Sequence, residues 1–540
     1  ALPDALEAHG RLLALLGDDL TRAEIGGVVA ELDAEGDGPA LALDPGVATD
    51  RLLELQVLST RGGRVAFRNP VLREAVARSA TDPERRAVHR AALRHHRAAR
   101  GVPDRERLPR LARHAEECGE RSEAAALWLG IAQDLRARHA YLEAEVLFTR
   151  ALGQLGDGEA PARLVARRGR GLVRYRLGRY DDAIADLAAA EALARGLADA
   201  AAEIECLLDE ATALDWMNDY ARSAERVAAA ARLCGDRPSP LAAARLELAR
   251  GRTLLRAARW GESAEALGGA ATRAEALGDE GYETLVVGLL LLGFVLPYLD
   301  RAAEAEQVLS RAHALATDRG DVLHVASALN NRRNVWVTRG DPERAALDQA
   351  AFLRLGRDLG MVGIEYVGEY NLGELLYQTG DLAGAGPHVV RAVAIERRHA
   401  EVAARPLARL LQARLLAFAG ELAGARAALA EARAVEEGAR REGRPGAILA
   451  PSDAVLADTV ELATRDGGSD EGSWLALRAR SRAVSVEQEP IEVCELHGLA
   501  ALRAGRLGEA RAALEEALRL SQGIPNVMQA RVRASLARCG

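Results

Sequence analysis

Small and apolar residues recur with a period of about 40 residues along most of this chain. The segments "GLVRYRLGRYDDAIADL" (171–187), "GRTLLRAARWGESAEAL" (251–267) and "GLAALRAGRLGEARAAL" (498–514) are variants of one pattern. Aligned on a central turn residue, the copies place their turns at Gly178, Asn218, Ala258, Asp300, Gly340, Gly380, Gly420 and Gly505. The last interval is about twice as long as the others, which leaves room for one eroded copy near positions 465–474.

Each copy predicts two antiparallel helices joined by a short turn. Seven positions before the turn stand Gly171, Ala211, Gly251, Gly293, Arg333, Gly373, Ala413 and Gly498, and all but Arg333 are small enough for two helices to approach closely. Five positions after the turn every copy has Ala or Ser, followed four positions later by Leu187, Val227, Leu267, Leu309, Gln349, Val389, Leu429 and Leu514. Small then large at i+4 forms one helical face. A single pair cannot bury that face, so stacked neighbours supply the core and each unit touches only its neighbours.

Residues 1 to about 100 do not follow this period. "LTRAEIGGVVAEL" (20–32) predicts an amphipathic helix, and residues 48–69 predict a helix, a hairpin around Gly62-Gly63 and a strand. Helix, helix, hairpin and helix is the order of a winged helix, which in a DNA reader carries arginines on its wing and recognition helix. Residues 59–100 hold 11 Arg against 3 acidic residues, so both DNA binding and a protein contact are open at this stage.

Composition narrows the function. The hydrophobic share is 49% but aromatic residues are only 4%, which is typical of helices packed through Ala, Leu and Val. A net charge of −8 argues against a main surface matched to nucleic acid. All 71 basic residues are Arg, because the sequence contains no Lys. This excludes a phosphate-binding Walker loop, a protein kinase and a Schiff-base enzyme within this chain.

The cysteines and the apolar run point to a cytoplasmic protein outside the membrane. Five widely spaced cysteines with no Cys-x-x-Cys are typical of reduced thiols: Cys118, Cys206, Cys234, Cys494 and Cys539. The longest apolar run extends from Leu285 to Leu299 and contains Pro297. It is shorter than the roughly 20 residues needed to span a bilayer, so this run predicts a buried helix.

No catalytic or metal-binding constellation emerges from the sequence. His89 and His96 share a helical face and His95 is adjacent, but no carboxylate partner or Cys/His cluster accompanies them. We interpret this segment as a solvated helix, and we expect no cofactor, no metal and no enzymatic activity of the chain itself.

The arginine-rich segment resembles a known family. "RVAFRNPVLREAVARSATDPERRAVHRAAL" (64–93) is similar to the segment that follows the nucleotide-binding module in STAND-type signal-transduction ATPases, and residues 108–152 continue the similarity. The family's usual His after Phe-Arg is Asn69 here. The period of the repeat resembles that of the tetratricopeptide-like repeat in the sensor arm of the maltose-regulon activator and its relatives.

This resemblance implies a regulatory arm whose ATPase or kinase module lies upstream of Ala1, in a chain that we interpret as a fragment or a processed product. In such proteins the winged helix packs on the ATPase, which implies a protein contact and no DNA contact for Arg61, Arg64, Arg68 and Arg73. We therefore predict an all-α fold: a winged-helix domain (1–100), linker helices with a first atypical repeat (101–160), and a right-handed superhelix of tetratricopeptide-like helix pairs (161–540).

A tetratricopeptide-like superhelix lines its concave groove with one stripe of the first helix of each pair. In most units this stripe is polar or aromatic, which suits a peptide, protein or small polar effector. The predicted effector-binding residues are Asp215, Trp216, Arg252, Arg256, Asn330, Asn334, Tyr370, Glu374, Tyr377 and Arg414. Two function classes remain open: a sensor arm that controls the upstream module, and a passive scaffold for protein partners.

Overall fold

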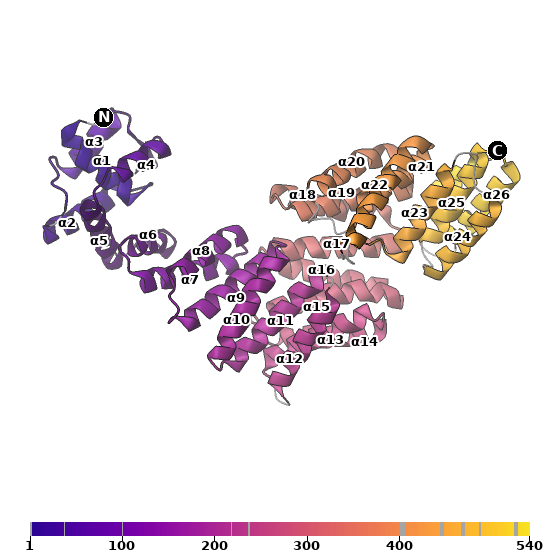
Figure 1. The fold of residues 1–540 in the computed structure, drawn as a ribbon, viewed down its shortest axis with the longest axis horizontal. Coiled ribbons are helices and arrows are strands. Elements are labelled where there is room, and N and C mark those ends of the chain that lie inside the picture. Colours follow the sequence, from indigo (N-terminus) through magenta and orange to yellow (C-terminus); the bar gives the residue numbers. More distant parts are fainter. Residues whose placement is uncertain are drawn as a thin grey trace. The chain divides into compact units, whose positions relative to one another are not determined.

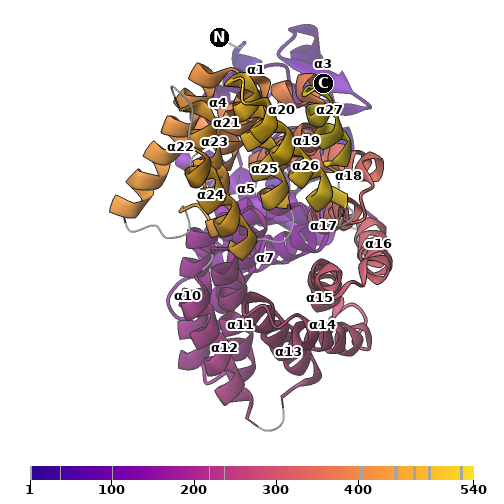
Figure 2. The ribbon, with the colours of Figure 1, turned by 90° about the vertical axis from the view of Figure 1, so that its right-hand side faces the viewer.

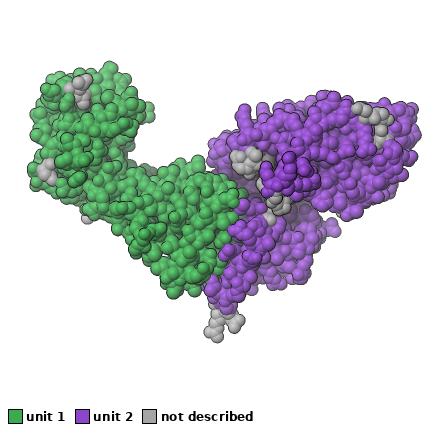
Figure 3. All heavy atoms as spheres, viewed as in Figure 1, with its two compact units in different colours: residues 1–213 green, residues 214–540 purple. Residues whose placement is uncertain are grey.

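Helices make up nearly the whole chain in the computed structural model, which describes residues 3–36, 38–99, 101–217, 219–235, 238–399, 405–442, 448–465, 470–484, 488–522 and 527–540. These ranges contain twenty-seven α-helices, one 3-10 helix and two short strands (Figure 1). The predicted fold class is confirmed: the chain is all-α, a superhelix of repeated helix pairs. It divides into two compact units, residues 1–213 and residues 214–540 (Figure 3).

The N-terminal part of the chain forms a small helical body with a β-hairpin. Its elements are α1 (Asp4–Leu16), α2 (Arg22–Glu35), α3 (Pro45–Glu54), β1 (Leu58–Arg61), β2 (Arg64–Phe67), α4 (Pro70–Arg78) and α5 (Asp82–Ala98). The strands pair antiparallel in the register Leu58↔Phe67, and the turn residues Gly62 and Gly63 both have positive φ, as a tight hairpin requires. Leu20 adds a bridge to Val65. The predicted hairpin is present, while the winged-helix assignment and the domain boundaries stay predictions.

Local sequence signals set the helix starts in this body. Both α2 and α5 begin with a Thr-x-x-Glu capping box, formed by Thr21 with Glu24 and by Thr81 with Glu84. Each box satisfies backbone N–H groups that the first turn of a helix leaves unpaired. The helices then bury Leu, Val and Ala side chains in one core of their own.

The remaining helices follow in pairs. Three connecting helices come first: α6 (Asp104–Glu117), α7 (Arg121–Ala137) and α8 (Tyr141–Gln154). The repeats are α9 (Ala160–Arg176) with α10 (Tyr180–Gly196), α11 (Ala200–Trp216) with α12 (Tyr220–Cys234), α13 (Pro240–Arg256) with α14 (Trp260–Glu275), α15 (Tyr282–Val295) and the 3-10 helix (Leu296–Leu299) with α16 (Ala302–Asp318), α17 (Val322–Thr338) with α18 (Pro342–Asp358), α19 (Val362–Thr379) with α20 (Leu382–Arg398), α21 (Leu407–Ala419) with α22 (Leu422–Arg441), α23 (Pro451–Thr464) with α24 (Glu471–Val484), and α25 (Gln488–Arg503) with α26 (Leu507–Gln522), before the terminal α27 (Gln529–Ala537). The pair α23–α24 lies where the eroded copy is predicted, near positions 465–474, of which 466–469 lie outside the described residues.

Every described predicted turn residue adopts the left-handed conformation. The positive φ values occur at Gly178, Ala258, Asp300, Gly340, Gly380, Gly420 and Gly505. A left-handed residue after the last helical turn reverses the chain and satisfies carbonyl groups at the helix end, which explains the preference for Gly there. The eighth predicted turn residue, Asn218, lies outside the described residues.

The small and large positions of the repeat pack as the sequence indicates. All eight positions that precede the turn by seven are buried, and so are seven of the eight large positions that follow it by nine. A Cβ added to Gly251 would lie 2.7 Å from side-chain atoms of Leu267, so a larger residue would push these two helices apart. In the second unit α13, α14, α15 and α16 lie side by side as a result (Figures 1 and 2).

The expectation that each repeat touches only its neighbours is wrong in the second unit. The terminal helices α25 and α27 fold back onto α19 and α21. Tyr377 donates a hydrogen bond from its hydroxyl to Glu492 (3.0 Å), and Arg531 donates one to the backbone carbonyl of Tyr377 (2.9 Å). Segments that are far apart in the sequence are thereby in contact, which a nearest-neighbour stack does not produce.

One apolar helix passes a length and composition test for a membrane span. It covers residues Tyr282–Leu299, and 56% of it is buried inside the protein. Leu285, Val286 and Leu289 pack there against α16 and α17. A core helix passes the same test, and this burial agrees with the buried helix that the sequence predicts.

Candidate functional site

The odd-numbered helices of the second unit form the inner side of the stack. Odd-numbered helices of successive pairs contact one another directly: α13 contacts α15, α15 contacts α17, and α19 contacts α21. Each even-numbered helix instead contacts the odd-numbered helix that follows it. Helices that approach one another more closely lie on the concave side of a curved stack. The predicted effector-binding residues lie on these helices, with both half-exposed and buried members.

The polar residues of α17 and α19 meet in one cluster. Asn371 donates a hydrogen bond from Nδ2 to Asn330 Oδ1 (2.9 Å), and Arg333 donates from Nη1 to Asn334 Oδ1 (3.0 Å). Arg333 also reaches the carbonyl oxygen of Asn371 (3.4 Å). The structure thus brings Asn330 and Asn334 close to α19 of the next repeat, as their positions in the repeat predict. The contacts are made through Asn371 and Arg333, which were not among the predicted effector-binding residues.

Glu374 is the carboxylate of this cluster. Tyr370 donates its hydroxyl hydrogen bond to Glu374 Oε1 (3.2 Å), and Arg414 Nη1 donates to the same oxygen (3.1 Å). Burial, and next the charge of Glu374, raises the pKa of Tyr370 well above its usual value. Tyr370 is therefore a neutral hydrogen-bonding group, and its ring packs against two core clusters.

Two predicted groove residues are placed differently from expectation. Tyr377 is 0% exposed, and Arg414 is 4% exposed. Both point into the contact with α25, where Arg414 makes two hydrogen bonds of 2.7 Å to the carboxylate of Glu492. The prediction that their side chains line an open groove is wrong, because the returning C-terminal helices cover that part of α19 and α21.

A second group of predicted residues meets between α11 and α13. Arg252 Nη1 lies 2.8 Å from Asp215 Oδ2, Arg256 pairs with Asp215 Oδ1, and the Arg256 guanidinium lies over the Tyr220 ring at 4.0 Å. The neighbouring Trp216 is 58% exposed. Three of the four predicted residues here therefore pair with one another, both arginines with the single carboxylate of Asp215, while Trp216 presents an exposed aromatic surface.

The four predicted interdomain arginines divide into two pairs. Arg64 forms an ion pair with Glu106 of α6, and Arg73 lies 3.3 Å from Asp18. These two contacts are made within the chain. Arg61 and Arg68 are exposed, and no ion pair to either occurs in the part of the chain that the structure describes. The predicted interdomain contact of these two arginines stays a prediction.

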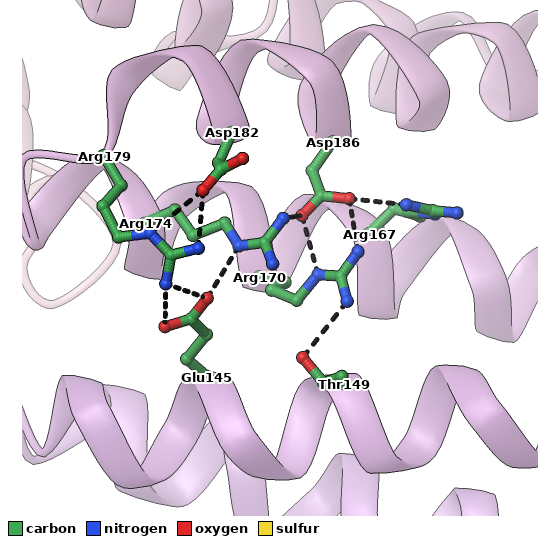
Figure 4. Close-up of polar contacts among 8 residues, drawn as sticks. All are labelled: Glu145, Thr149, Arg167, Arg170, Arg174, Arg179, Asp182 and Asp186. Atoms are coloured by element: carbon green, nitrogen blue, oxygen red, sulfur yellow. Dashed lines mark hydrogen bonds and ion pairs between the residues drawn. The ribbon is translucent and has the colours of Figure 1, made fainter.

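A cluster of arginines lies in the first unit, between α8, α9 and α10 (Figure 4). Asp186 is 1% exposed and accepts hydrogen bonds of 2.7–2.8 Å from Arg167, Arg170 and Arg174. Burial alone would raise the pKa of this carboxyl, but the bonds from Arg170 and Arg167 outweigh it and hold the pKa below its usual value. Glu145 balances Arg174 and Arg179. With Asp182, three carboxylates pair with four arginines, and these ion pairs join α8, α9 and α10.

The histidines of α5 are not on a solvated helix as predicted. His89 is 1% exposed and its Nδ1 lies 2.9 Å from Nδ1 of His114 in α6, while the rings of His96 and His114 stack at 5.6 Å. Burial, with the nearby charges of Arg113 and Arg85, lowers the pKa of His89 to about 4. The sequence showed the spacing of these residues, but only the packing of α6 on α5 buries them.

One set of donors in the described residues has a spacing suited to a metal ion: Glu283, Asp321 and His324, whose donor atoms lie within 4.8 Å of one another. Asp321 caps α17 by accepting hydrogen bonds from the backbone N–H of His324 (3.3 Å) and from the hydroxyl of Tyr282 (3.2 Å). Its Oδ2 also lies 2.6 Å from His324 Nδ1. Asp321 is therefore engaged both as the cap of α17 and as the side-chain partner of Tyr282 and His324.

Arg333 is the residue that the register analysis missed. Its position is Gly or Ala in the seven other clear copies, and Gln349 stands at the matching large position of the same repeat. Both are buried, and neither amide atom of Gln349 has a hydrogen-bond partner in the described structure. This deviation from the repeat pattern is visible in the sequence, and it could have identified Arg333 as a candidate functional residue.

Fold and site together define an α-helical repeat protein with a partly buried polar cluster on its inner helices. No protein-family model matches the chain, and no curated protein matches it. Solved structures with similarity include a STAND protein with a tetratricopeptide repeat sensor from Pyrococcus horikoshii (14% identity, 82% of this chain, 64% of that chain, TM-score 0.46), apo RapI (11%, 66%, 97%, 0.48) and the apo quorum sensor NprR from B. thuringiensis (13%, 64%, 98%, 0.45). The chain spans less than two thirds of the STAND protein's length. These similarities identify no family, so function is argued from the site.

Proposed function

We propose that this chain is a regulatory arm that binds a peptide or small polar effector on the inner helices of residues 214–540 and so controls an upstream ATPase or kinase module. The observation that carries the proposal is the polar cluster of α17 and α19. Asn330, Asn334 and Glu374 are half-buried, and all three take part in the hydrogen bonds of this cluster. Amides and a carboxylate held in place by hydrogen bonds can pair with a polar ligand.

The same contacts could transmit ligand binding to the upstream module. Asn330 with Asn371, and Arg333 with Glu374, link two successive repeats through their side chains. A ligand that takes over one of these partners changes the link between the repeats. A ligand with different affinities for the two arrangements shifts their populations.

In this proposal any catalytic activity belongs to the upstream module and not to this chain. The chain contains no Lys, so it supplies no Walker loop or kinase lysine, and we expect no nucleotide hydrolysis by it. The winged-helix-like body would contact the upstream module through Arg61 and Arg68, without a DNA complex. Five cysteines with free thiols fit a cytoplasmic protein.

The test is a thermal-shift screen of the purified chain against a pool of random hexapeptides and a mixture of small polar metabolites. A hit should raise the Tm and slow hydrogen exchange in α17 and α19. Asn334→Ala should weaken the hit while changing stability by only about 1 kcal/mol, the scale of one hydrogen bond. Gln133→Ala, an exposed change on α7, is the matched control. The proposal would be contradicted if Asn334→Ala left the binding of every hit unchanged, or if neither mixture contained a hit.

A passive scaffold is the second candidate, and exposed apolar residues between α11 and α12 favour it. Trp216, Met217 and Tyr220 are 58%, 38% and 42% exposed, which suits a protein partner. A scaffold should capture a folded protein through Trp216 without a change of hydrogen exchange in α17 and α19. An effector-dependent change there separates the two functions.

A further inference from the structure

One repeat of this chain breaks the packing rule that the others follow. In the copies with Gly171, Gly251 and Gly498, an added Cβ would lie within 3.0 Å of the facing Leu187, Leu267 or Leu514. The α17–α18 repeat has Arg333 and Gln349 at the corresponding positions. Both are buried, and the two amide atoms of Gln349 and the Nε of Arg333 have no hydrogen-bond partner in the described structure. Buried polar atoms without partners destabilise a fold, so packing does not explain this pair.

The pairing of Arg333 is incomplete by comparison with the other buried arginines. Four arginines among the described residues are at most 9% exposed: Arg170, Arg333, Arg414 and Arg531. Three of them hold a carboxylate with two hydrogen bonds, namely Asp186 (2.7 and 2.8 Å), Glu492 (2.7 and 2.7 Å) and Glu495 (3.0 and 2.7 Å). Arg333 lies 3.9 Å from its nearest carboxylate oxygen, in Glu374. That carboxylate already accepts hydrogen bonds from Arg414 and Tyr370.

The environment of Arg333 is short of negative charge. Burial lowers the pKa of Arg333, and the charge of Glu374 only partly opposes this. A buried cation needs a contact partner to offset its lost hydration. The three other buried arginines show that this fold supplies such a partner where the arginine has an internal role.

Unused donors gather beside Arg333. Asn330 lies three positions before Arg333, on the same face of α17, and Asn334 is the next residue, close enough for its Oδ1 to accept a hydrogen bond from Arg333 Nη1 (3.0 Å). The amide oxygens of both accept hydrogen bonds, from Asn371 and from Arg333 respectively. Within the described ranges neither amide NH2 group donates a hydrogen bond, and neither is buried without a partner, so both reach solvent. Arg333 Nη2 makes a long hydrogen bond of 3.4 Å to the Asn371 carbonyl and lies 3.9 Å from Glu374 Oε2.

We propose that the face of α17 formed by Asn330, Arg333 and Asn334 binds a carboxylate of a peptide ligand. The carboxylate supplies the missing partner of Arg333, meeting the Nη1–Nη2 edge of the guanidinium because Nε is covered. The two amide NH2 groups donate to the same carboxylate or to the adjoining peptide group. This site rests on the proposed function and specifies its ligand: a peptide that presents a free C-terminal or side-chain carboxylate.

The test mixes the full chain in solution with each of three pools of random hexapeptides. Size exclusion separates bound from free peptides, and mass spectrometry identifies the peptides that stay with the protein. The first pool lacks Asp and Glu and has a free C-terminus; the second is the same pool amidated; the third is amidated but includes Asp and Glu. The wild-type chain should retain the first or the third, which identifies the source of the carboxylate, and not the second. Arg333→Ala should reduce retention by roughly tenfold or more, the equivalent of a charge-assisted hydrogen bond. Arg354→Ala, an exposed change on α18, should leave it unchanged.

Retention of the second pool, which contains no carboxylate, as strongly as the others, or unchanged retention by Arg333→Ala, would overturn this site while leaving peptide binding as such in place. Failure of all three pools would overturn the site and peptides as effectors, and a metabolite hit at Asn334 would still support the proposed function. A second variant, Arg333→Ala with Gln349→Leu, restores the pair found in other repeats. Its Tm should equal or exceed that of the wild type; a clearly lower Tm would show that Arg333 is structural and would overturn the proposal.

Discussion

At the level of single residues, buried arginines and their carboxylates specify how neighbouring helices pack. Asp186 joins α10 to three arginines of α9 (Figure 4), and Glu492 joins α25 to Arg414 of α21. With no Lys in the sequence, every such pair uses the planar guanidinium, which binds a carboxylate through two parallel hydrogen bonds. Removing one partner leaves an uncompensated charge in the interior, so single substitutions at these sites have large effects.

Asp186→Asn tests the cluster of Figure 4. The amide cannot neutralise Arg167, Arg170 and Arg174, so we expect a loss of roughly 2–4 kcal/mol, moderated by the partial exposure of these arginines. Native-state hydrogen exchange of α9 and α10 measures it. Asp182→Asn is the control, because its exposed pair with Arg179 should contribute less than about 1 kcal/mol. Equal effects of the two changes would contradict a buried network.

The histidines of α5 and α6 predict an acid-sensitive contact. The pKa of His89 is lowered to about 4 and that of His114 lies well below its usual 6.5, both mainly through burial. Between pH 6.5 and 4 the unfolded chain binds more protons than the folded one, so stability falls as pH decreases in this window, by at most about 1.4 kcal/mol per pH unit for each histidine. Hydrogen exchange of α5 at pH 6.5 and pH 5 measures this loss. His89→Gln should reduce the pH dependence, and an unchanged slope would contradict the assignment.

At the level of secondary-structure elements, the turn inside each helix pair sets the geometry of the repeat. All described turns place one residue in the left-handed conformation, and most of these residues are Gly. Ala258 and Asp300 adopt it despite their Cβ atoms, with φ of 53° and 57°. Those two turns store strain that the glycine turns avoid.

Exchanging these turn residues should change stability in opposite directions. Ala258→Gly removes strain and should raise stability by about 0.5–1 kcal/mol, partly offset by the entropy of Gly in the unfolded chain. Gly420→Ala introduces the same strain at φ 88°, where a Cβ has no atom within 4 Å, and should lower stability by about 1 kcal/mol. Both changes lie in the second unit and can be compared by thermal unfolding. A loss of stability with Ala258→Gly would show that the turn is not strained.

At the level of the whole molecule, the return of α25 and α27 onto α19 and α21 makes residues 214–540 more cooperative than a simple stack. The contact contains Tyr377, Arg414, Glu492, Glu495 and Arg531, all of them almost fully buried. Ser535 adds a hydrogen bond of 2.7 Å to Glu495. Repeats that are distant in sequence therefore share one core, and a perturbation of the C-terminus should reach α19.

Glu492→Gln tests this closure. The change leaves Arg414 buried without its two-bond partner, and we expect a loss of about 3–5 kcal/mol. Hydrogen exchange should accelerate in α19 and α21 as well as in α25. Glu515→Gln, an exposed change on α26, should alter neither region. Loss of protection confined to α25 would support independent repeats instead.

The helix pairs, their period and their turns could be predicted from the sequence, because they depend on local properties: small residues where helices touch, and residues that tolerate positive φ between them. The deviation at Arg333 and Gln349 was also visible there. The sequence could not show which polar residues of the inner helices reach solvent. Tyr377 and Glu374 belong to the same predicted groove-facing stripe of α19. Tyr377 is nevertheless buried, because α25 and α27, which are distant in sequence, pack against it. His89 and His96 of α5 are likewise buried, next to His114 of α6. Contacts between distant segments depend on how the repeats curve in space, and a periodic pattern of local residues carries no record of that curvature.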